Sequence, residues 1–326
     1  MKFTIIIPVY NRPDEIEELL ESLKNQTLKN FDLVIVEDGS KLDCKKEVEK
    51  YSQELDIKYF QKENTGPAKT RNYGAERASG EYFIFFDSDC VIPPEYFEIT
   101  TKQLEKEDVD AYGGPDAADE SFSNLQKAIS HSMTSLFTTG KIRGGEKIDK
   151  FYPRSFNMGI KKTVWDKIGG FPITSMFPGE DMVFSIEIIK QGFKTKLFKN
   201  SKVYHKRRNT VRTFFKQVAG FGRTRYIISR VYPETFKIFY LFPSMFTLGI
   251  LGLLIISVFC QLFLLPIALY SLLVFSEAMI TNKFNFKVSF LSVITSFIQL
   301  IGYGTGFISA IFKGDVYDVY QKGFYK

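Results

Sequence analysis

A long stretch without charge is the feature that most constrains this chain. No Asp, Glu, Lys or Arg occurs from Ile238 to Ser276, a run of about 39 residues. One helix of that length would extend roughly 58 Å, whereas the hydrocarbon core of a bilayer is about 30 Å thick. The run therefore predicts two membrane spans joined by a hairpin, near residues 238–259 and 262–280, rather than buried helices of a soluble domain.

A second uncharged run, residues 288–312, is also long enough to cross a bilayer. The predicted transmembrane region therefore covers residues 237–313 with two to three helices, and residues 314–326 form a short tail. Three crossings would leave this tail on the far side, whereas a broken or re-entrant third segment would not. The sequence leaves these two topologies open.

Positive charge is concentrated just ahead of the first span. Residues 190–237 contain 14 Lys or Arg against one acid, Glu234, so this segment carries +13 and the rest of the chain sums to −7 within the total of +6. Basic residues that flank a span mark the cytoplasmic face, and Lys283 and Lys287 return to that face. We therefore expect a multi-pass protein of the cell inner (cytoplasmic) membrane.

The N-terminus does not read as a signal peptide. Its apolar run, residues 3–9, is too short and is followed at once by polar residues. The first 230 residues are therefore expected to stay on the cytoplasmic side. Three widely spaced cysteines, Cys44, Cys90 and Cys260, indicate a reducing compartment rather than a disulfide framework or a zinc site.

The region before the spans alternates apolar runs with helical patterns. A parallel strand that is covered on both faces requires a continuous apolar run, and strands that alternate with helices indicate a parallel α/β sheet. The predicted strands are residues 2–9, 31–36, 57–60 and 82–86. Three helices are predicted: the first begins at Pro13, the second ends near Leu55, and the third covers residues 67–78. The fold class is therefore α/β, with a mostly parallel, Rossmann-like sheet.

Polar residues follow the ends of these strands, where ligands bind in an open parallel sheet. Asp87 and Asp89 come after the fourth strand, and residues two apart along extended backbone share a face. Carboxylates held so close repel each other unless a cation lies between them. Hard oxygen ligands favour Mg²⁺ or Mn²⁺, so we interpret this pair as a metal site.

Two cations begin the helix that precedes this strand. Lys69 and Arg71 follow a Gly-Pro helix start, and a helix N-terminus with basic side chains suits an anionic ligand. Either residue alone is also typical of a solvated helix surface.

Taken together, these motifs resemble the family 2 glycosyltransferases of the nucleotide-diphosphosugar (GT-A) fold. The resemblance covers roughly residues 2–225 and rests on Ile-Ile-Pro-Val-Tyr-Asn, Val-Glu-Asp-Gly-Ser, Gly-Pro-Ala-Lys-Thr-Arg-Asn, Phe-Phe-Asp-Ser-Asp and Gly-Glu-Asp in that order. It implies a GT-A domain at residues 1–230, whose last part, about 200–230, is a basic interface segment ahead of the C-terminal transmembrane helices.

The resemblance also implies the site residues. The residues expected to bind the nucleotide and donor are Pro8, Tyr10, Asp38, Lys69, Arg71, Asn72, Asp87, Ser88, Asn157 and Met158. The metal is expected at Asp87, Asp89 and His205. Glu37 stands where the family often has a second aspartate, which leaves Asp38 as the expected nucleotide ligand.

By the same resemblance, Asp181, with Glu180 beside it, is the catalytic base of an inverting transfer. Such a transfer needs a carboxylate near the acceptor hydroxyl to remove its proton. Carboxylates at the start of a helix, here predicted at residues 182–190, also serve as simple caps.

A basic and aromatic segment, residues 210–225, precedes the first span. Its composition would fit nucleic acid, but its position favours an amphipathic helix beside membrane lipids and no nucleic-acid partner. It resembles the part of membrane-bound family members that holds a lipid-linked acceptor, which implies an acceptor or interface role for Gln217, Arg223 and Arg225. The alternative is that these charges only set the topology.

The sequence thus predicts a metal-dependent, hexosyltransferase-like enzyme. It would move a sugar from a nucleotide-diphosphate donor to a lipid-linked glycan, for cell-surface polysaccharide assembly. One alternative is a polyprenyl-phosphate glycosyltransferase, whose anionic acceptor needs no strong base. A non-catalytic membrane scaffold that kept a nucleotide pocket is another, and a polymerising synthase is disfavoured because the chain lacks the further spans of a channel.

Overall fold

The apolar runs near the N-terminus form the centre of the main sheet. The structure is a computed structural model that describes residues 1–140, 151–172 and 178–313. The sheet has seven strands in the order β3-β2-β1-β4-β8-β6-β9. Its strands are β1 (Phe3–Val9), β2 (Phe31–Asp38), β3 (Ile57–Lys62), β4 (Tyr82–Phe86), β6 (Ala111–Gly113), β8 (Asn157–Lys161) and β9 (Thr195–Leu197). The first four strands are parallel, and β8 runs antiparallel to both of its neighbours. The mostly parallel α/β sheet is therefore confirmed.

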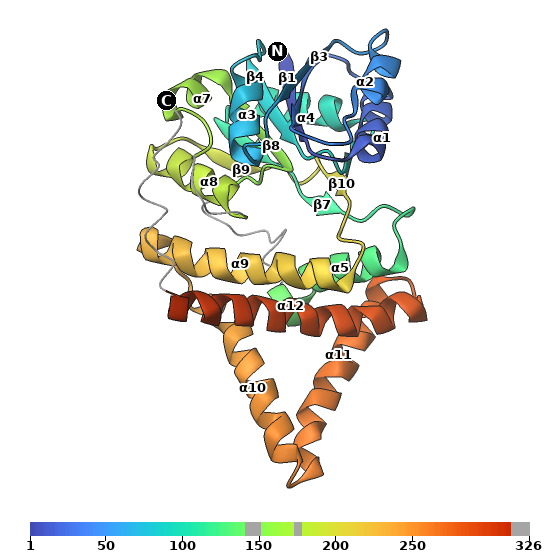
Figure 1. Ribbon diagram of the computed structural model, residues 1–326, viewed down its shortest axis with the longest axis vertical. Helices are drawn as coiled ribbons and strands as arrows, with labels where there is room; N and C mark the ends of the chain where they lie inside the picture. The colour runs from blue at the N-terminus through green and yellow to red at the C-terminus, as the bar shows by residue number, and fades with distance from the viewer. Residues whose placement is uncertain (141–150, 173–177, 314–326) are drawn as a thin grey trace.

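Helices cover both faces of this sheet (Figure 1). The helices of this domain are α1 (Pro13–Lys24), α2 (Lys45–Tyr51), α3 (Pro67–Ala75), α4 (Tyr96–Lys106), α5 (Asn124–Thr134), α6 (Leu136–Thr139), α7 (Lys162–Ile168), α8 (Glu180–Lys190) and α9 (Val211–Val231). A small second sheet, in the order β5-β10-β7, consists of β5 (Cys90–Val91), β7 (Asp116–Ala117) and β10 (Val203–His205).

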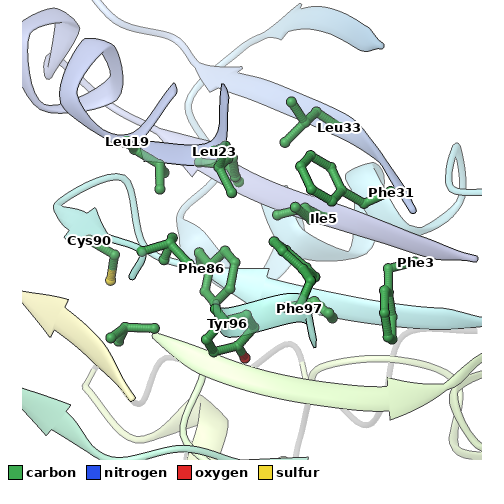
Figure 2. Packing of buried hydrophobic residues seen from close by; sticks show 14 of the residues in the cluster. Phe3, Ile5, Leu19, Leu23, Phe31, Leu33, Phe86, Cys90, Tyr96 and Phe97 are labelled. Atoms are coloured by element: carbon green, nitrogen blue, oxygen red, sulfur yellow. The ribbon is translucent and has the colours of Figure 1, made fainter. Parts of the chain in front are cut away.

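Alternation along β1 builds two hydrophobic cores, one on each face of the sheet. Ile5 and Ile7 pack into the core beneath α1 and α4, where Figure 2 shows Ile5 beside Phe31 and Phe97. Ile6 points the other way, into the core that contains Phe85 and residues of α7 and α8. Side chains of successive strand residues point to opposite faces, so a strand buried on both sides needs the unbroken apolar run seen in the sequence.

The third helix is shorter than the sequence suggested. The prediction covered residues 67–78, but α3 ends at Ala75, and the next two turns are closed by bonds from Arg77 N to Gly74 O and from Ala78 N to Ala75 O. The chain then brings Gly80 against β1, where an added Cβ would lie 2.6 Å from Thr4 N. Only a residue without a side chain can make this approach.

The C-terminal part contains three long apolar helical segments. They are η2 (Ile238–Leu241) with α10 (Phe242–Ser257), η3 (Gln261–Leu264) with α11 (Leu265–Thr281), and α12 (Phe286–Lys313), and η1 (Pro233–Thr235) precedes them. By length and composition each segment can cross a membrane, which supports membrane association. Residues 314–326, the predicted tail, lie outside the described residues.

These segments are not arranged as three parallel spans. Helices α10 and α11 form a hairpin that points away from the sheet domain, whereas α12 lies across the open end of the hairpin, alongside α9 (Figure 1). The approach of α9 to α12 is close, because an added Cβ on Gly222 of α9 would overlap the carbonyl oxygen of Tyr303. The pair α9–α12 therefore forms a layer between the sheet domain and the hairpin.

We predict that Gly222→Ala lowers the thermal unfolding midpoint of the detergent-solubilised protein. An alanine normally stabilises a helix by about 1 kcal/mol relative to glycine, but overpacking against backbone costs about 1–3 kcal/mol. Gly249→Ala in α10 is the matched control, since an added Cβ there meets nothing within 4 Å. Equal midpoints for the two variants would contradict the close α9–α12 packing.

Candidate active site

The candidate site lies where the parallel strands end. Because β1, β2 and β4 run in parallel and in register, their carboxyl ends bring Tyr10, Asp38 and Asp87 to the same edge of the sheet. Tyr10 is 51% exposed there, and Pro8 precedes it in the last part of β1. The structure therefore brings these predicted residues to one edge of the sheet, and their roles there stay predictions.

Asp89 and His205 come together at this edge. His205 ends β10, which pairs with β5 directly after Asp89, and its Nε2 lies 3.1 Å from Asp89 Oδ1. This contact is an ion pair, and the buried Oδ1 has no other partner in the described part of the chain. Burial works against both charges, yet their mutual attraction lowers the pKa of Asp89 and raises the pKa of His205.

These donors fit a divalent cation. Among the described residues, Asp89, Cys90 and His205 have ligand atoms within 4.8 Å of one another. Burial raises the pKa of the Cys90 thiol far above its usual range, which disfavours a thiolate ligand. The carboxylate of Asp89 is the hard oxygen ligand that Mg²⁺ or Mn²⁺ prefers, and the imidazole of His205 is the second candidate ligand. Asp87, the other predicted ligand, is not in this group.

Asp87 is instead paired with Arg71. Arg71 is buried and bridges two acids, with Nη2 2.7 Å from Asp87 Oδ1 and Nη1 3.1 Å from Glu180 Oε1. The predicted donor residues Arg71 and Asp87 are thus in direct contact, and they connect α3 to the start of α8. Ser88, between the two aspartates, is buried.

Asp38 is bound by the loop that begins α3. Its carboxylate accepts hydrogen bonds from Thr65 N (2.9 Å) and Gly66 N (3.0 Å) and is paired with Lys62. The adjacent Glu37 accepts from Cys44 N at 3.0 Å. Both acids therefore hold loops in place, and a nucleotide role for Asp38 stays a prediction.

Three predicted donor residues have side chains that point into the protein. Asn72 holds the backbone of Phe171 through two hydrogen bonds of 2.8 and 2.9 Å. Asn157 is fully buried, accepts from Tyr96 Oη at 2.6 Å and donates to Ser201 O at 2.8 Å. Met158 lies in the hydrophobic core. The structure does not bring these side chains to the edge, whereas Lys69 is exposed on α3.

Glu180 and Asp181 begin α8 and differ in their environments. Asp181 Oδ2 lies 2.7 Å from Arg154 Nε, and its Oδ1 accepts from Met182 N at 2.7 Å. Burial raises the pKa of Glu180, and the charge of Asp181 adds to this effect. Burial also opposes the charge of Asp181, but Arg154 outweighs it and lowers that pKa.

Three cations of the site, Arg12, Lys62 and Arg154, were not predicted from the sequence. Arg12 Nη1 lies 2.5 Å from Asp89 Oδ2, and the other two pair with Asp38 and Asp181. Buried carboxylates need cationic partners, so the acids at the strand ends indicate that such partners exist. The sequence does not indicate which of the 43 basic residues lie near them.

Helix α9 lies directly beneath the start of α8. Thr224 donates a hydrogen bond to the carbonyl oxygen of Pro178, two residues before Glu180. Among the predicted acceptor residues, Arg223 is exposed and Gln217 is half-buried. Arg225 is also half-buried, covers the ring of Tyr240 at 4.3 Å, and has a buried Nη1 without a hydrogen-bond partner in the described chain.

We predict that Arg71→Met destabilises the protein by about 3–5 kcal/mol, the usual cost of removing one partner of a buried ion pair. The loss would appear as a large drop in the thermal unfolding midpoint. Lys102→Met is the control, because Lys102 and Glu98 form an exposed pair on α4 that water screens. If the two variants unfold alike, Arg71 does not hold the site together.

Comparison with known proteins agrees with this geometry. The sequence profile described as glycosyl transferase family 2 matches residues 4–169. A protein of Methanococcus voltae, described as a dolichyl N-acetyl-alpha-D-glucosaminyl phosphate 3-beta-D-2,3-diacetamido-2,3-dideoxy-beta-D-glucuronosyltransferase, is 23% identical over 321 residues, which are 96% of this chain and 98% of that protein. Matches to Rickettsia proteins described as uncharacterized glycosyltransferases are 38–41% identical over 105 residues, but the chain covers only 15–17% of their length.

Two solved structures share the fold. The mannosyltransferase PcManGT of Pyrobaculum calidifontis, bound to GDP-Man and Mn²⁺, has a TM-score of 0.62 at 14% identity over 91% of this chain and 87% of that one. TarS 1–349 of Staphylococcus aureus, bound to UDP-GlcNAc, has a TM-score of 0.51 at 22% identity over 69% of this chain and 66% of that one. At these identities the likeness shows the GT-A fold alone. Since the family profile covers half of the sequence and the sheet edge carries the expected acids, the chain belongs to the family 2 glycosyltransferases.

Proposed function

We propose that this glycosyltransferase is a metal-dependent, inverting, hexosyltransferase-like enzyme. Its acceptor is a lipid-linked glycan at the cytoplasmic face of the inner membrane, and its product serves cell-surface polysaccharide assembly. Its donor is a nucleotide sugar. One observation carries the proposal: Arg71 joins Glu180 to Asp87, which is two residues before the Asp89–His205 pair, so both groups of acids lie at one site above α9 and the C-terminal helices.

On the donor side, Asp89 and His205 would hold Mg²⁺ or Mn²⁺, with Asp87 next to them. When bound, such an ion neutralises the charge that develops on a departing nucleotide diphosphate. The Mn²⁺ in the PcManGT structure supports this assignment. Arg12 and Arg71 already contact the two aspartates, and as guanidinium groups they can orient phosphate oxygens with paired hydrogen bonds.

On the acceptor side, Asp181 would take the proton of the attacking hydroxyl group. Its carboxylate is held by Arg154 and by Met182 N, which fixes its direction but weakens it as a base. Base catalysis therefore requires Asp181 to accept a proton even though Arg154 lowers its pKa. A shift of Arg154 from Asp181 toward an anionic group of the acceptor would restore basicity at that moment.

The same ion pair favours a second candidate function, transfer to a polyprenyl phosphate. A phosphate acceptor is already an anion and needs no strong base, which suits a carboxylate with a lowered pKa. The Methanococcus relative acts, by its description, on a dolichyl-linked sugar phosphate, which supports a lipid-linked acceptor in either case.

We predict that Asp89→Asn lowers sugar transfer by about 10²–10³-fold, the range for losing one group that stabilises transition-state charge. It should also abolish the Mn²⁺-dependent rise in unfolding temperature that nucleoside diphosphates produce by binding the folded state. Asp108→Asn is the control, since that acid is exposed.

A scan of nucleoside diphosphates by this thermal assay would also identify the base of the donor. Full activity of Asp89→Asn would refute the metal assignment. Tight, metal-dependent nucleotide binding by the wild type without turnover of any nucleotide sugar would instead favour a non-catalytic scaffold.

We further predict that Asp181→Asn separates the two acceptor classes. With a hydroxyl acceptor, loss of the base should lower kcat by about 10²–10⁴-fold, with little change in the Kd for the donor nucleotide. Retention of most activity would show that the acceptor is a phosphate. Arg154→Gln offers a second measurement, because it should shift the acidic limb of the pH–rate profile to higher pH if Asp181 is the base.

A further inference from the structure

Helix α12 is apolar enough to span a membrane, yet its surroundings differ from those of α10 and α11. Half of its most apolar window is buried within the protein, against 6% and 11% for the other two segments. It lies against α9 along one side and contacts α5 through a hydrogen bond of 3.0 Å from Thr295 Oγ1 to Ala128 O. One side of α12 therefore lies against the two helices beneath the sheet domain (Figure 1).

The two faces of α12 have different chemistry. The face toward α9 and α5 is largely buried. It includes the small or polar residues Ser292, Thr295, Gln299, Gly302 and Gly306, beside the apolar Ile298 and Phe307. The opposite face is apolar and contains Phe286, Phe290, Ile294, Phe297 and Ile301. The first three of these are 40–67% exposed. A helix with one face covered by protein and an apolar face left open can lie in the plane of a membrane surface.

The apolar face continues onto the hairpin. Phe297 packs against Phe246 of α10 and Tyr270 of α11, with ring centroids 5.9 and 5.2 Å apart. Phe286 packs against Phe275 of α11 at 5.4 Å. The surface that α12 presents is therefore continuous with the lipid-facing surface of the two spans.

The charges on α9 decide how deep α12 can lie. Exposed Arg212, Lys216, Arg223 and Arg230 are spread along the length of α9, which is packed on α12 at Gly222, Gly302 and Gly306. If α12 crossed the bilayer, α9 would have to enter the hydrocarbon with these side chains. In-plane placement instead leaves them at the level of the lipid head groups.

We propose that α12 lies in the plane of the membrane with its apolar face in the acyl region of one leaflet, and that the chain crosses the bilayer only twice. This inference rests on the proposed placement of the hairpin in a membrane. Lys287 and Lys313, at the two ends of α12, are then on the same side as the sheet domain, and the tip of the hairpin is alone on the far side.

Cysteine labelling in intact cells tests this topology. Cys260 lies between α10 and α11 at the tip, whereas Cys44 and Cys90 are buried, so the wild type reports the far side. In a Cys260→Ser background, Lys313→Cys reports the end of α12 and Lys287→Cys its start, and both positions are exposed. The probe is a membrane-impermeant maleimide, applied before and after the membrane is opened.

We expect Cys260 to react in intact cells, and both introduced cysteines to react only after the membrane is opened. Labelling of Lys313→Cys but not Lys287→Cys in intact cells would show that α12 spans, and would overturn the inference. Labelling of both, with Cys260 protected, would support the in-plane helix but refute the cytoplasmic orientation. Phe312→Cys, at a residue that is 85% exposed, repeats the test if Lys313→Cys fails to accumulate.

Discussion

The site depends on a pairing of each buried carboxylate with a cation. Asp38, Asp87 and Asp89 lie at the ends of parallel strands, and Glu180 and Asp181 lie at the start of α8. Without partners their charges would repel one another. Lys62, Arg71, Arg12, His205 and Arg154 come from distant parts of the chain to contact them. Breaking such a pair leaves an uncompensated buried charge, which costs about 3–5 kcal/mol. These ion pairs therefore both permit the acids to be buried and fix the positions of their side chains in the site.

Helix α9 connects this site to the membrane. Its upper side bonds to Pro178, just ahead of the Glu180–Asp181 pair, and packs with the core of α8 through Ile227, Ile228 and Val231. Its lower side packs against α12. A displacement of α12 would thus be transmitted to the start of α8 through one helix, α9. This arrangement suits an enzyme whose acceptor is held by a lipid, because the acceptor must approach the site from the membrane side.

The placement of α12 shows why hydropathy alone cannot give the topology of such a chain. An Arg or Lys at the centre of a bilayer costs about 2.5–3.5 kcal/mol on insertion scales, so the exposed basic residues along α9 oppose the immersion of α9 together with α12. Hydropathy evaluates α12 by itself. Whether α12 crosses the membrane depends on the charges of α9, a helix more than fifty residues earlier in the sequence.

Local patterns in the sequence determined the elements and their order. Continuous apolar runs identified β1 and β4, and shorter, mostly apolar segments identified β2 and β3. The uncharged run identified the hairpin, and the motifs placed Asp38, Asp87, Asp89 and Glu180–Asp181 at strand or helix ends. Only the tertiary structure decided which groups meet. It paired Asp87 with Arg71, turned Asn157 and Met158 into the interior, inserted the antiparallel β8, and laid α12 beside α9. The physical reason is that burial, periodicity and charge density are properties of a segment, whereas an ion pair or a helix contact depends on the relative position of residues that are distant along the chain.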